Sequence, residues 1–366
     1  MIVYAIAITA SLLLSHYKST SHELLNGRKT YIINHTLTAF LIVLPLFLVA
    51  AFRWNVGADS VYYSSYWQAY RAAANKVNSL KFEGGFYLLM RTLSSMKVPY
   101  FWFLFIHQTI FTSCFCYALK KGSVWISWSI LVFFLLYVYF DSYSSLRQSL
   151  AESISLIAWA KMGTDKKSLK KDIQITLLFL LGTFFHSIAM INIPIYFACK
   201  VRFNRKSILL FIVLMVILTP AIQVSMKFLM RLIGGSDYTF IGTAVINAIM
   251  TAALCLLCWY FYDEICSMGE HVHMYVNLSV FIFLLILNSG AMYLPYRVFD
   301  MLKIGYVFII PYLLRSLRSK RIRVCLQWIL LATFSAWFLK EFFLPNSFVI
   351  NYQSALEHWS VIIHYP

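Results

Sequence analysis

The segment FRWNVGADSVYY, residues 52–63, places charged side chains directly behind a long apolar run. Its Arg53 can bind phosphate oxygens in a bidentate way and stays charged in most surroundings. Its Asp59 can act as a general base on a hydroxyl, or as the N-cap of a helix that begins at Ser60. Gly57 lets the chain turn tightly between the two. The segment therefore predicts either a site for an anion and a hydroxyl or a simple helix start.

Further polar residues interrupt or end other apolar runs. An Arg or Asp at the centre of a membrane-spanning helix costs about 2.5 to 3.5 kcal/mol, so such a residue needs a partner or a function. Each alone also has a structural explanation, because an Arg at a helix end is a common interfacial anchor and a lone His is often a packing residue. The residues of this kind are Asp141, Arg147, His186, Arg297 and Asp300.

Tyrosines follow Asp59 at a helical spacing. Tyr62, Tyr66 and Tyr70 are four residues apart and so share one face of a helix. Such a face suits either contact with sugars or an aromatic belt at a membrane surface. We take Tyr62, Tyr63 and Tyr66 as candidate sugar-binding residues.

The sequence lacks the common metal and nucleotide motifs. It has no D-x-D pair, H-E-x-x-H, G-x-S-x-G or Walker loop. We therefore expect no metal and no cofactor, and a lipid-linked pyrophosphate is a better candidate ligand than a metal-bound nucleotide sugar. The seven cysteines lack partners at zinc spacing, lie mostly within the expected spans and are expected to be packing residues.

The composition is that of a membrane protein. Of 366 residues, 61% are apolar and 12% charged, against about 25% charged in soluble domains. Apolar stretches of about 20 residues recur, each long enough to cross the hydrocarbon layer as a helix. We expect an all-α polytopic protein with one membrane domain over residues 1–366 and a retained N-terminal helix. The ten expected transmembrane helices cover residues 1–16, 31–52, 100–119, 123–140, 144–162, 207–233, 241–262, 275–293, 301–316 and 324–340.

Residues 172–199 can form one over-long helix or a re-entrant hairpin that turns near His186. Short cytoplasmic loops are rich in Lys and Arg. The hairpin puts most of the 31 Lys and Arg residues inside, whereas a single span divides them almost evenly. We therefore predict the hairpin, with both termini, loop 53–99 and tail 341–366 outside. The net charge of +17 then reflects cytoplasmic loops that contact anionic lipid, and not a nucleic-acid partner.

A set of short motifs resembles the Wzy/EpsG-type polymerases of bacterial surface polysaccharides. The motifs cover residues 53–299, about two thirds of the chain, and Ala58 stands where that family's pattern has Thr. In order, they are Arg53 with Val56 to Asp59 and Tyr63, then Phe82 to Phe86, Ser145 to Ala151, Phe185 to Ser187, and Arg297 to Phe299.

The resemblance implies a fold similar to the lipid-dependent GT-C glycosyltransferases. It also implies an enzyme of the bacterial plasma (inner) membrane that joins undecaprenyl-pyrophosphate-linked repeat units at the outer face. Its partners would be a lipid-linked glycan donor and acceptor, membrane lipid and a chain-length regulator protein. A flippase or transporter of lipid-linked oligosaccharide, an oligosaccharide ligase and, less well, a membrane O-acyltransferase remain alternatives.

Within that function, the residues divide by role. Preorganised cations stabilise the departing pyrophosphate, and we assign this to Arg53, Arg147, His186 and Arg297. The acceptor hydroxyl must lose a proton. The first candidate for the base is Asp59 and the second is Glu83, and His186 is also a catalytic candidate.

Overall fold

The structure is a computed structural model that describes residues 2–24, 28–33, 35–54, 56–72, 82–164, 168–232, 241–289, 293–343 and 352–356. In these ranges the regular structure is helical apart from one two-stranded sheet, β1 (Thr20–Leu24) and β2 (Arg28–Ile32). The helices are α1 (Ile2–Lys18), α2 (Thr36–Ala51), α3 (Ser60–Ala72), α4 (Gly84–Ser95), α5 (Tyr100–Gly122), α6 (Ile126–Leu135), α7 (Val138–Ser144), α8 (Leu146–Thr164), α9 (Leu169–Phe185), η2 (Ser187–Ile191), α10 (Asn192–Cys199), α11 (Arg205–Leu232), α12 (Ile241–Tyr260), α13 (Tyr262–Cys266), α14 (His273–Ser289), α15 (Tyr293–Lys303), α16 (Tyr306–Ser316) and α17 (Lys320–Phe342).

Several helices are long and apolar enough to cross a membrane. Among the described residues these are α5, the Arg205–Ser225 part of α11, and α17, with α6 and α7 as a fourth candidate if they count as one bent span. Six further apolar helices of 10–17 residues accompany them. The all-α membrane class is confirmed, and the number of ten spans stays a prediction.

Two expected spans in the first half differ in detail. The span predicted from residue 31 begins as a helix only at Thr36, because residues 28–32 pair with β1 instead. The span predicted over 123–140 breaks at Tyr137, whose φ of 65° is left-handed, and α6 and α7 meet there at 48°. The break moves Asp141 into the first turn of the short helix α7.

The segment 172–199 reverses direction in the structure. Helix α9 ends at Phe185, His186 adopts an extended conformation, and η2 and α10 run back. The two ends meet because Asp172 accepts a hydrogen bond of 2.5 Å from the Tyr196 hydroxyl and pairs with Lys200. A single over-long helix is therefore excluded, while re-entry into a membrane stays a prediction.

The region around residue 300 also differs from expectation. The span predicted over 301–316 is a pair of helices, α15 and α16, separated at Ile304 and Gly305. Arg297 and Asp300 therefore lie within α15 and do not simply open a span.

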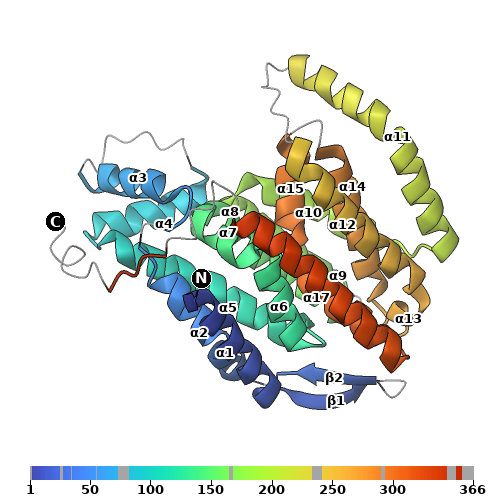
Figure 1. Cartoon of the computed structure of the whole chain (residues 1–366). Helices are drawn as coiled ribbons and strands as arrows, with labels where there is room; N and C mark the ends of the chain where they lie inside the picture. The colour runs from blue at the N-terminus through green and yellow to red at the C-terminus, as the bar shows by residue number, and fades with distance from the viewer. Residues whose placement is uncertain are drawn as a thin grey trace.

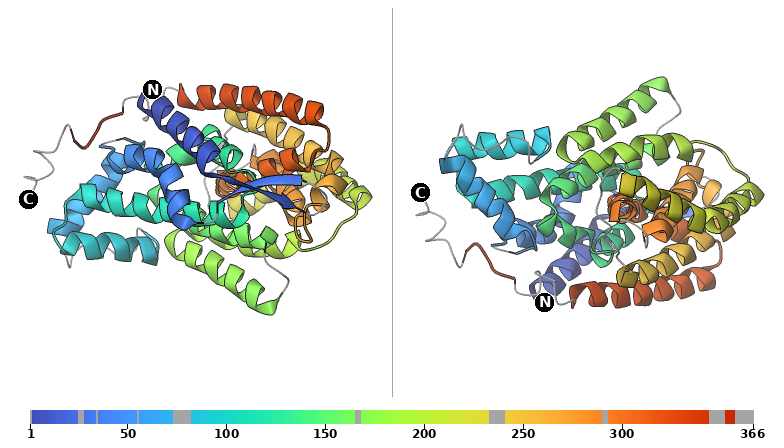
Figure 2. Two further views of the ribbon diagram at one scale, coloured as in Figure 1. Left: turned by 90° about the horizontal axis from the view of Figure 1, so that it is seen from below. Right: turned by 90° about the horizontal axis from the view of Figure 1, so that it is seen from above.

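Helix α8 is the centre of the molecule. Its side chains are buried along most of its length, and it packs against α5 and α9. Figure 1 shows α3 and α4 at one end of the molecule and the β1–β2 sheet at another edge. Figure 2 shows α9 and α17 along opposite flanks of the bundle. Both flanking helices expose large apolar side chains, such as Leu177 of α9 and Trp328 of α17, as lipid-facing helices do.

Candidate functional site

Glu83 lies at the centre of a cluster of charged groups. Its Oε2 is 2.7 Å from Arg147 Nη1, and its Oε1 is 3.0 Å from His186 Nδ1. The backbone N–H of Ser187 also donates to Oε1, at 3.3 Å. The Glu83 carboxylate therefore joins the start of α4, the start of α8 and the turn after α9.

Two glycines allow α4 to reach that turn. A Cβ on Gly84 would lie 2.8 Å from a ring carbon of Phe184. A Cβ on Gly85 would lie 2.8 Å from the backbone oxygen of the same phenylalanine. From the sequence alone, a glycine pair at this place predicts no more than a tight turn of the external loop. The structure shows instead that the missing side chains let the first turn of α4 press against the end of α9, which brings Glu83 to His186.

Arg147 is held on several sides. Its guanidinium carbon lies 5.3 Å from the centre of the Phe82 ring, in cation–π geometry, and the group also interacts with Tyr63. The side chain is 24% exposed, so the fixed guanidinium is still open to a ligand.

Asp59 is a second carboxylate that interacts electrostatically with Arg147. The charge of a further cation, Arg297, also acts on it. Its position depends on Gly57, whose φ is +115° and where a Cβ would lie 2.3 Å from the Tyr143 oxygen. Among the described residues, none makes a hydrogen bond to the Asp59 carboxylate, so the N-cap contact that we considered is not formed there.

Helix α15 brings Arg297 to this end of α8. One turn along α15, Met301 is fully buried against Ala151 of α8 and Ala189 of η2. The two alanines leave room for close packing of three elements that are distant in sequence. Arg297 is thus carried by a helix that rests on both the Arg147 helix and the His186 turn.

Arg53 is placed differently from our expectation. Its side chain is 1% exposed, and it donates to the backbone oxygens of Ala50 at 2.5 Å and Ser142 at 3.4 Å. Its guanidinium carbon lies 4.7 Å from the centre of the Tyr143 ring. Among the described contacts, none joins it to Glu83. In this structure Arg53 ties α2 to α7 and has almost no surface for a phosphate.

The three candidate tyrosines are not equivalent. Tyr63 is 3% exposed and packs against Phe82, whereas Tyr62 is 44% exposed. The rings of Tyr62 and Tyr66 are 4.7 Å apart, and the Tyr66 ring lies 5.0 Å from that of Phe82. Only the Tyr62 and Tyr66 side of this group offers an aromatic surface beside the charged cluster.

One ion pair network was not predicted from the sequence. Lys303 of α15 is 6% exposed, with its Nζ 2.7 Å from Asp141 Oδ2 and 3.0 Å from Asp300 Oδ1. It links α15 to α7 beside the segment that carries Asp59. A lysine near the start of a predicted apolar span was the available signal, because a charge in such a place needs partners.

The two carboxylates of the site titrate differently. Partial burial raises the pKa of Glu83, but the hydrogen bond from His186 and the charge of Arg147 outweigh it and hold the pKa at about 2. For Asp59, loss of solvent raises the pKa above its usual value, although Arg297 and Arg147 act in the other direction. Glu83 is therefore a firmly ionised anchor, and Asp59 is the more basic of the two.

In the described part of the chain, no three His, Cys, Asp or Glu side chains gather as a metal site would require. Beside the Lys303 network, a second group consists of Glu83 with its partners Arg147 and His186, and of Asp59, on whose carboxylate the charges of Arg147 and Arg297 act. These residues come from five separate segments, and together they can hold an anion next to a carboxylate.

Fold and site together define a mainly helical protein of membrane type with a cluster of charged side chains around Glu83. The chain belongs to the EpsG family, because the family model matches residues 36–354, which include every candidate site residue. This is a family of membrane proteins similar to Wzy-type polysaccharide polymerases, and it points to polymerisation in polysaccharide biosynthesis. Comparisons with curated proteins and with solved structures give no match.

Proposed function

We propose that this protein is a glycosyltransferase that polymerises undecaprenyl-pyrophosphate-linked repeat units at the outer face of a bacterial plasma membrane. The observation that carries the proposal is the pairing of the Glu83 carboxylate with Arg147 and His186. A second carboxylate, Asp59, is subject to the charges of Arg147 and Arg297. Several fixed cations suit a pyrophosphate, and a neighbouring carboxylate suits an acceptor hydroxyl.

In the proposed reaction, the bond between the anomeric carbon of the donor glycan and its pyrophosphate oxygen breaks. The acceptor hydroxyl oxygen forms the new bond to that carbon, and its proton passes to a carboxylate. Negative charge develops on the leaving pyrophosphate, where preorganised donors stabilise it. Arg147 and Arg297 supply such charge, and so does His186 when its ring is protonated.

Asp59 is the better candidate for the base. Glu83 is already paired with Arg147 and His186, and a carboxylate with a pKa of about 2 is a weak proton acceptor. Asp59 has a raised pKa and no hydrogen-bond donor among the described residues. Glu83 then has a positioning role, since it holds the Arg147 guanidinium and the His186 ring in place.

The remaining candidate residues take supporting roles. Tyr62 and Tyr66 offer an aromatic surface for a sugar ring, while Tyr63 helps to hold Arg147. The burial of Arg53 favours a structural role over direct contact with phosphate. In this scheme the site needs no metal, and a chain-length regulator protein is an additional partner.

The main alternatives are a flippase and an oligosaccharide ligase. Alternating-access transporters bind their substrate near the membrane midplane, whereas the described cations gather at one end of the bundle beside a base. A ligase would share the donor site and differ only in its acceptor, so a product assay must decide.

The test uses purified protein with a synthetic undecaprenyl-pyrophosphate repeat unit, and separates the products on a gel. A ladder of products that is lost in Arg147→Ala is expected for a polymerase. No product from the intact, folded protein would contradict the proposal and favour transport. Transfer only to an added foreign acceptor, without a ladder, would favour a ligase.

A further inference from the structure

An apolar pocket with a volume of about 330 Å³ lies between α10, α11 and α14. Its walls include Ile208 and Phe211 of α11, and Val280 and Phe281 of α14, and Val201 lies at its edge with 48% of its surface exposed. The volume is at the lower end of the range for small-molecule sites. The lining suits an aliphatic chain.

Asn277 is the polar residue of the lining, and its amide is already occupied. Its Nδ2 donates to the backbone oxygens of Cys199 and Val201, at 2.9 Å each. The amide therefore fixes the end of the hairpin onto α14 and does not call for a polar ligand. An occupant of this pocket is held by van der Waals contact and exclusion of water.

Basic and aromatic residues lie near the pocket, around the start of α11. The Arg205 guanidinium carbon lies 4.8 Å from the Trp259 ring, and the Trp259 indole donates to the Arg205 oxygen at 2.9 Å. The Tyr262 hydroxyl donates to the oxygen of Phe203, at 2.6 Å. Lys206 is exposed beside them. Tryptophan, tyrosine and basic residues gather in this way at a membrane surface.

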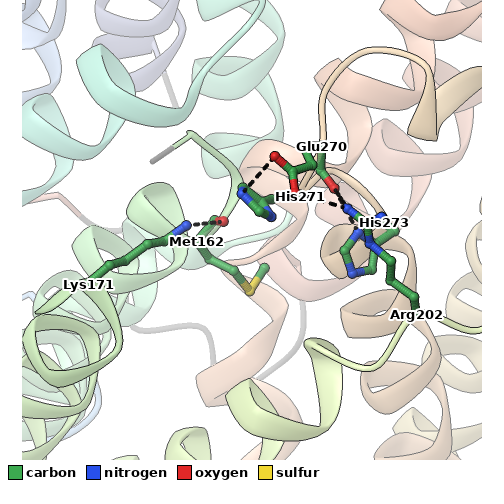
Figure 3. Close-up of polar contacts among 6 residues, drawn as sticks. All are labelled: Met162, Lys171, Arg202, Glu270, His271 and His273. Carbon is green, nitrogen blue, oxygen red and sulfur yellow. Dashed lines mark hydrogen bonds and ion pairs between the residues drawn. The ribbon is translucent and has the colours of Figure 1, made fainter. Parts of the chain in front are cut away.

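The neighbouring cation Arg202 is largely engaged. Figure 3 shows it extending to the turn before α14, where its Nη2 lies 3.1 Å from the Glu270 oxygen and 3.3 Å from Oε1 of the same residue. The same view shows Lys171, which donates to the Met162 oxygen at 3.1 Å. Among the described cations near the pocket, Arg205 and Lys206 are not paired with a described carboxylate and are available to an anion.

The pocket lies below Arg205 along α11, as an acyl chain lies below the headgroup of a lipid. Ile208 and Phe211 follow Arg205 by three and six residues, which is about 4.5 and 9 Å along a helix. Only 17% of the apolar stretch of α11 is buried inside the protein. Lipid can thus approach the pocket from the side of α11.

We propose that this pocket binds an acyl chain of an anionic phospholipid, with the lipid phosphate held by Arg205 and Lys206. The lipid is distinct from the glycan carrier, because the pocket lies at the base of the 172–199 hairpin and His186 at its tip. The 17 residues of α9 separate the two by about 25 Å. The bound acyl chain contacts α10, α11 and α14 and so holds the three helices together.

The experiment measures lipid binding to the purified full-length protein by native mass spectrometry. Phosphatidylglycerol is titrated against phosphatidylcholine with the same acyl chains and against a polyprenyl phosphate. We expect phosphatidylglycerol to bind more tightly than phosphatidylcholine. Removing both cations in Arg205→Ala with Lys206→Ala should weaken it about 25-fold, since each basic residue near a membrane surface contributes about fivefold.

Matched variants test the pocket and the charges separately. Val201→Trp fills the mouth and should abolish retention of phosphatidylglycerol, whereas Val213→Trp, at a position of similar exposure on α11, should not. Arg318→Ala with Arg321→Ala removes two exposed cations elsewhere and should have little effect. Equal binding of both phospholipids, displacement of phosphatidylglycerol by polyprenyl phosphate, or equal loss in both tryptophan variants would overturn the proposal.

Discussion

At the scale of single residues, Asp59 and Glu83 are two carboxylates of one site with different surroundings. Asp59→Asn should lower the polymerisation rate about 100- to 10,000-fold, because an amide cannot accept the acceptor's proton. Asparagine has nearly the same size and shape as aspartate, and the Asp59 carboxylate makes no hydrogen bond among the described residues, so the amount of protein in the membrane should not change. The measurement is product formation per amount of purified protein. A variant that polymerises at the normal rate would show that Asp59 is not the base.

The pH dependence separates the two carboxylates further. A base works only when ionised, so the rate should fall as the pH drops through the raised pKa of Asp59. This acid limb should lie above the usual aspartate value and not near pH 2, the range in which Glu83 is protonated. The position of this limb is obtained from initial rates of the purified enzyme, measured from pH 4 to 8. A rate that stays constant over this range would exclude a base with a raised pKa.

Variants of Arg147 test whether a positive charge alone is sufficient for catalysis at this position. Arg147→Ala should reduce the rate about 100- to 1,000-fold, as the loss of one transition-state donor does in other enzymes. Arg147→Lys should recover little of this, because lysine cannot contact the Glu83 carboxylate and a phosphate with one planar fork. Rates are compared with that of Arg321→Ala, an exposed arginine outside the site. Full activity of the lysine variant would reduce Arg147 to a membrane anchor.

At the scale of elements, the approach of the 56–59 segment to α7 controls where Asp59 lies. Gly57→Ala puts a methyl group 2.3 Å from the Tyr143 oxygen at a φ of +115°. Strain of this kind costs about 1 to 3 kcal/mol, and we expect a lower thermal stability together with a lost or much reduced rate.

Gly269→Ala serves as the control for that change. Apart from its chain neighbours, the nearest atom to a Cβ at this position is a methyl carbon at the end of the Val272 side chain, at 3.0 Å, and no unusual φ is involved. It should be nearly neutral in thermal unfolding and in polymer synthesis. If the two glycine variants behave alike, the tight contact at Gly57 does not position Asp59.

At the scale of the whole molecule, the hairpin gathers the basic turns at one end. Asp172 pairs with Lys200, and Arg202 with Glu270, so the turns near residues 171, 203 and 270 lie together. If that end is cytoplasmic, single cysteines at Lys206 and Arg318 should resist an impermeant thiol reagent in intact cells. A cysteine at Met96, which is 66% exposed, should react.

The labelling is done in a chain whose exposed Cys325 is replaced by serine. Lysed cells serve as the control, because both cytoplasmic positions should then react. Labelling of Lys206→Cys in intact cells would reverse the topology and move the candidate site to the inner face. A further position that we considered for labelling, near Ser236, lies outside the described residues.

The family and the helical membrane class follow from the sequence alone. Apolar length decides which segments become helices, since a membrane leaves few alternatives for the backbone. The reversal at His186 was also predictable, because the positions of lysine and arginine report topology. Motif residues such as Arg147 and Glu83 were identifiable by type and order.

The pairing of those residues was decided by tertiary structure. Hydropathy does not show that Gly84 and Gly85 dock against Phe184, so nothing in the sequence indicated that Glu83 pairs with both Arg147 and His186. The interior orientation of Arg53 depends on carbonyl oxygens and a ring supplied by α2 and α7. Lys303 between Asp141 and Asp300 likewise requires α15 to reach α7. Such contacts join residues far apart in the chain, and packing of whole helices determines which of them meet.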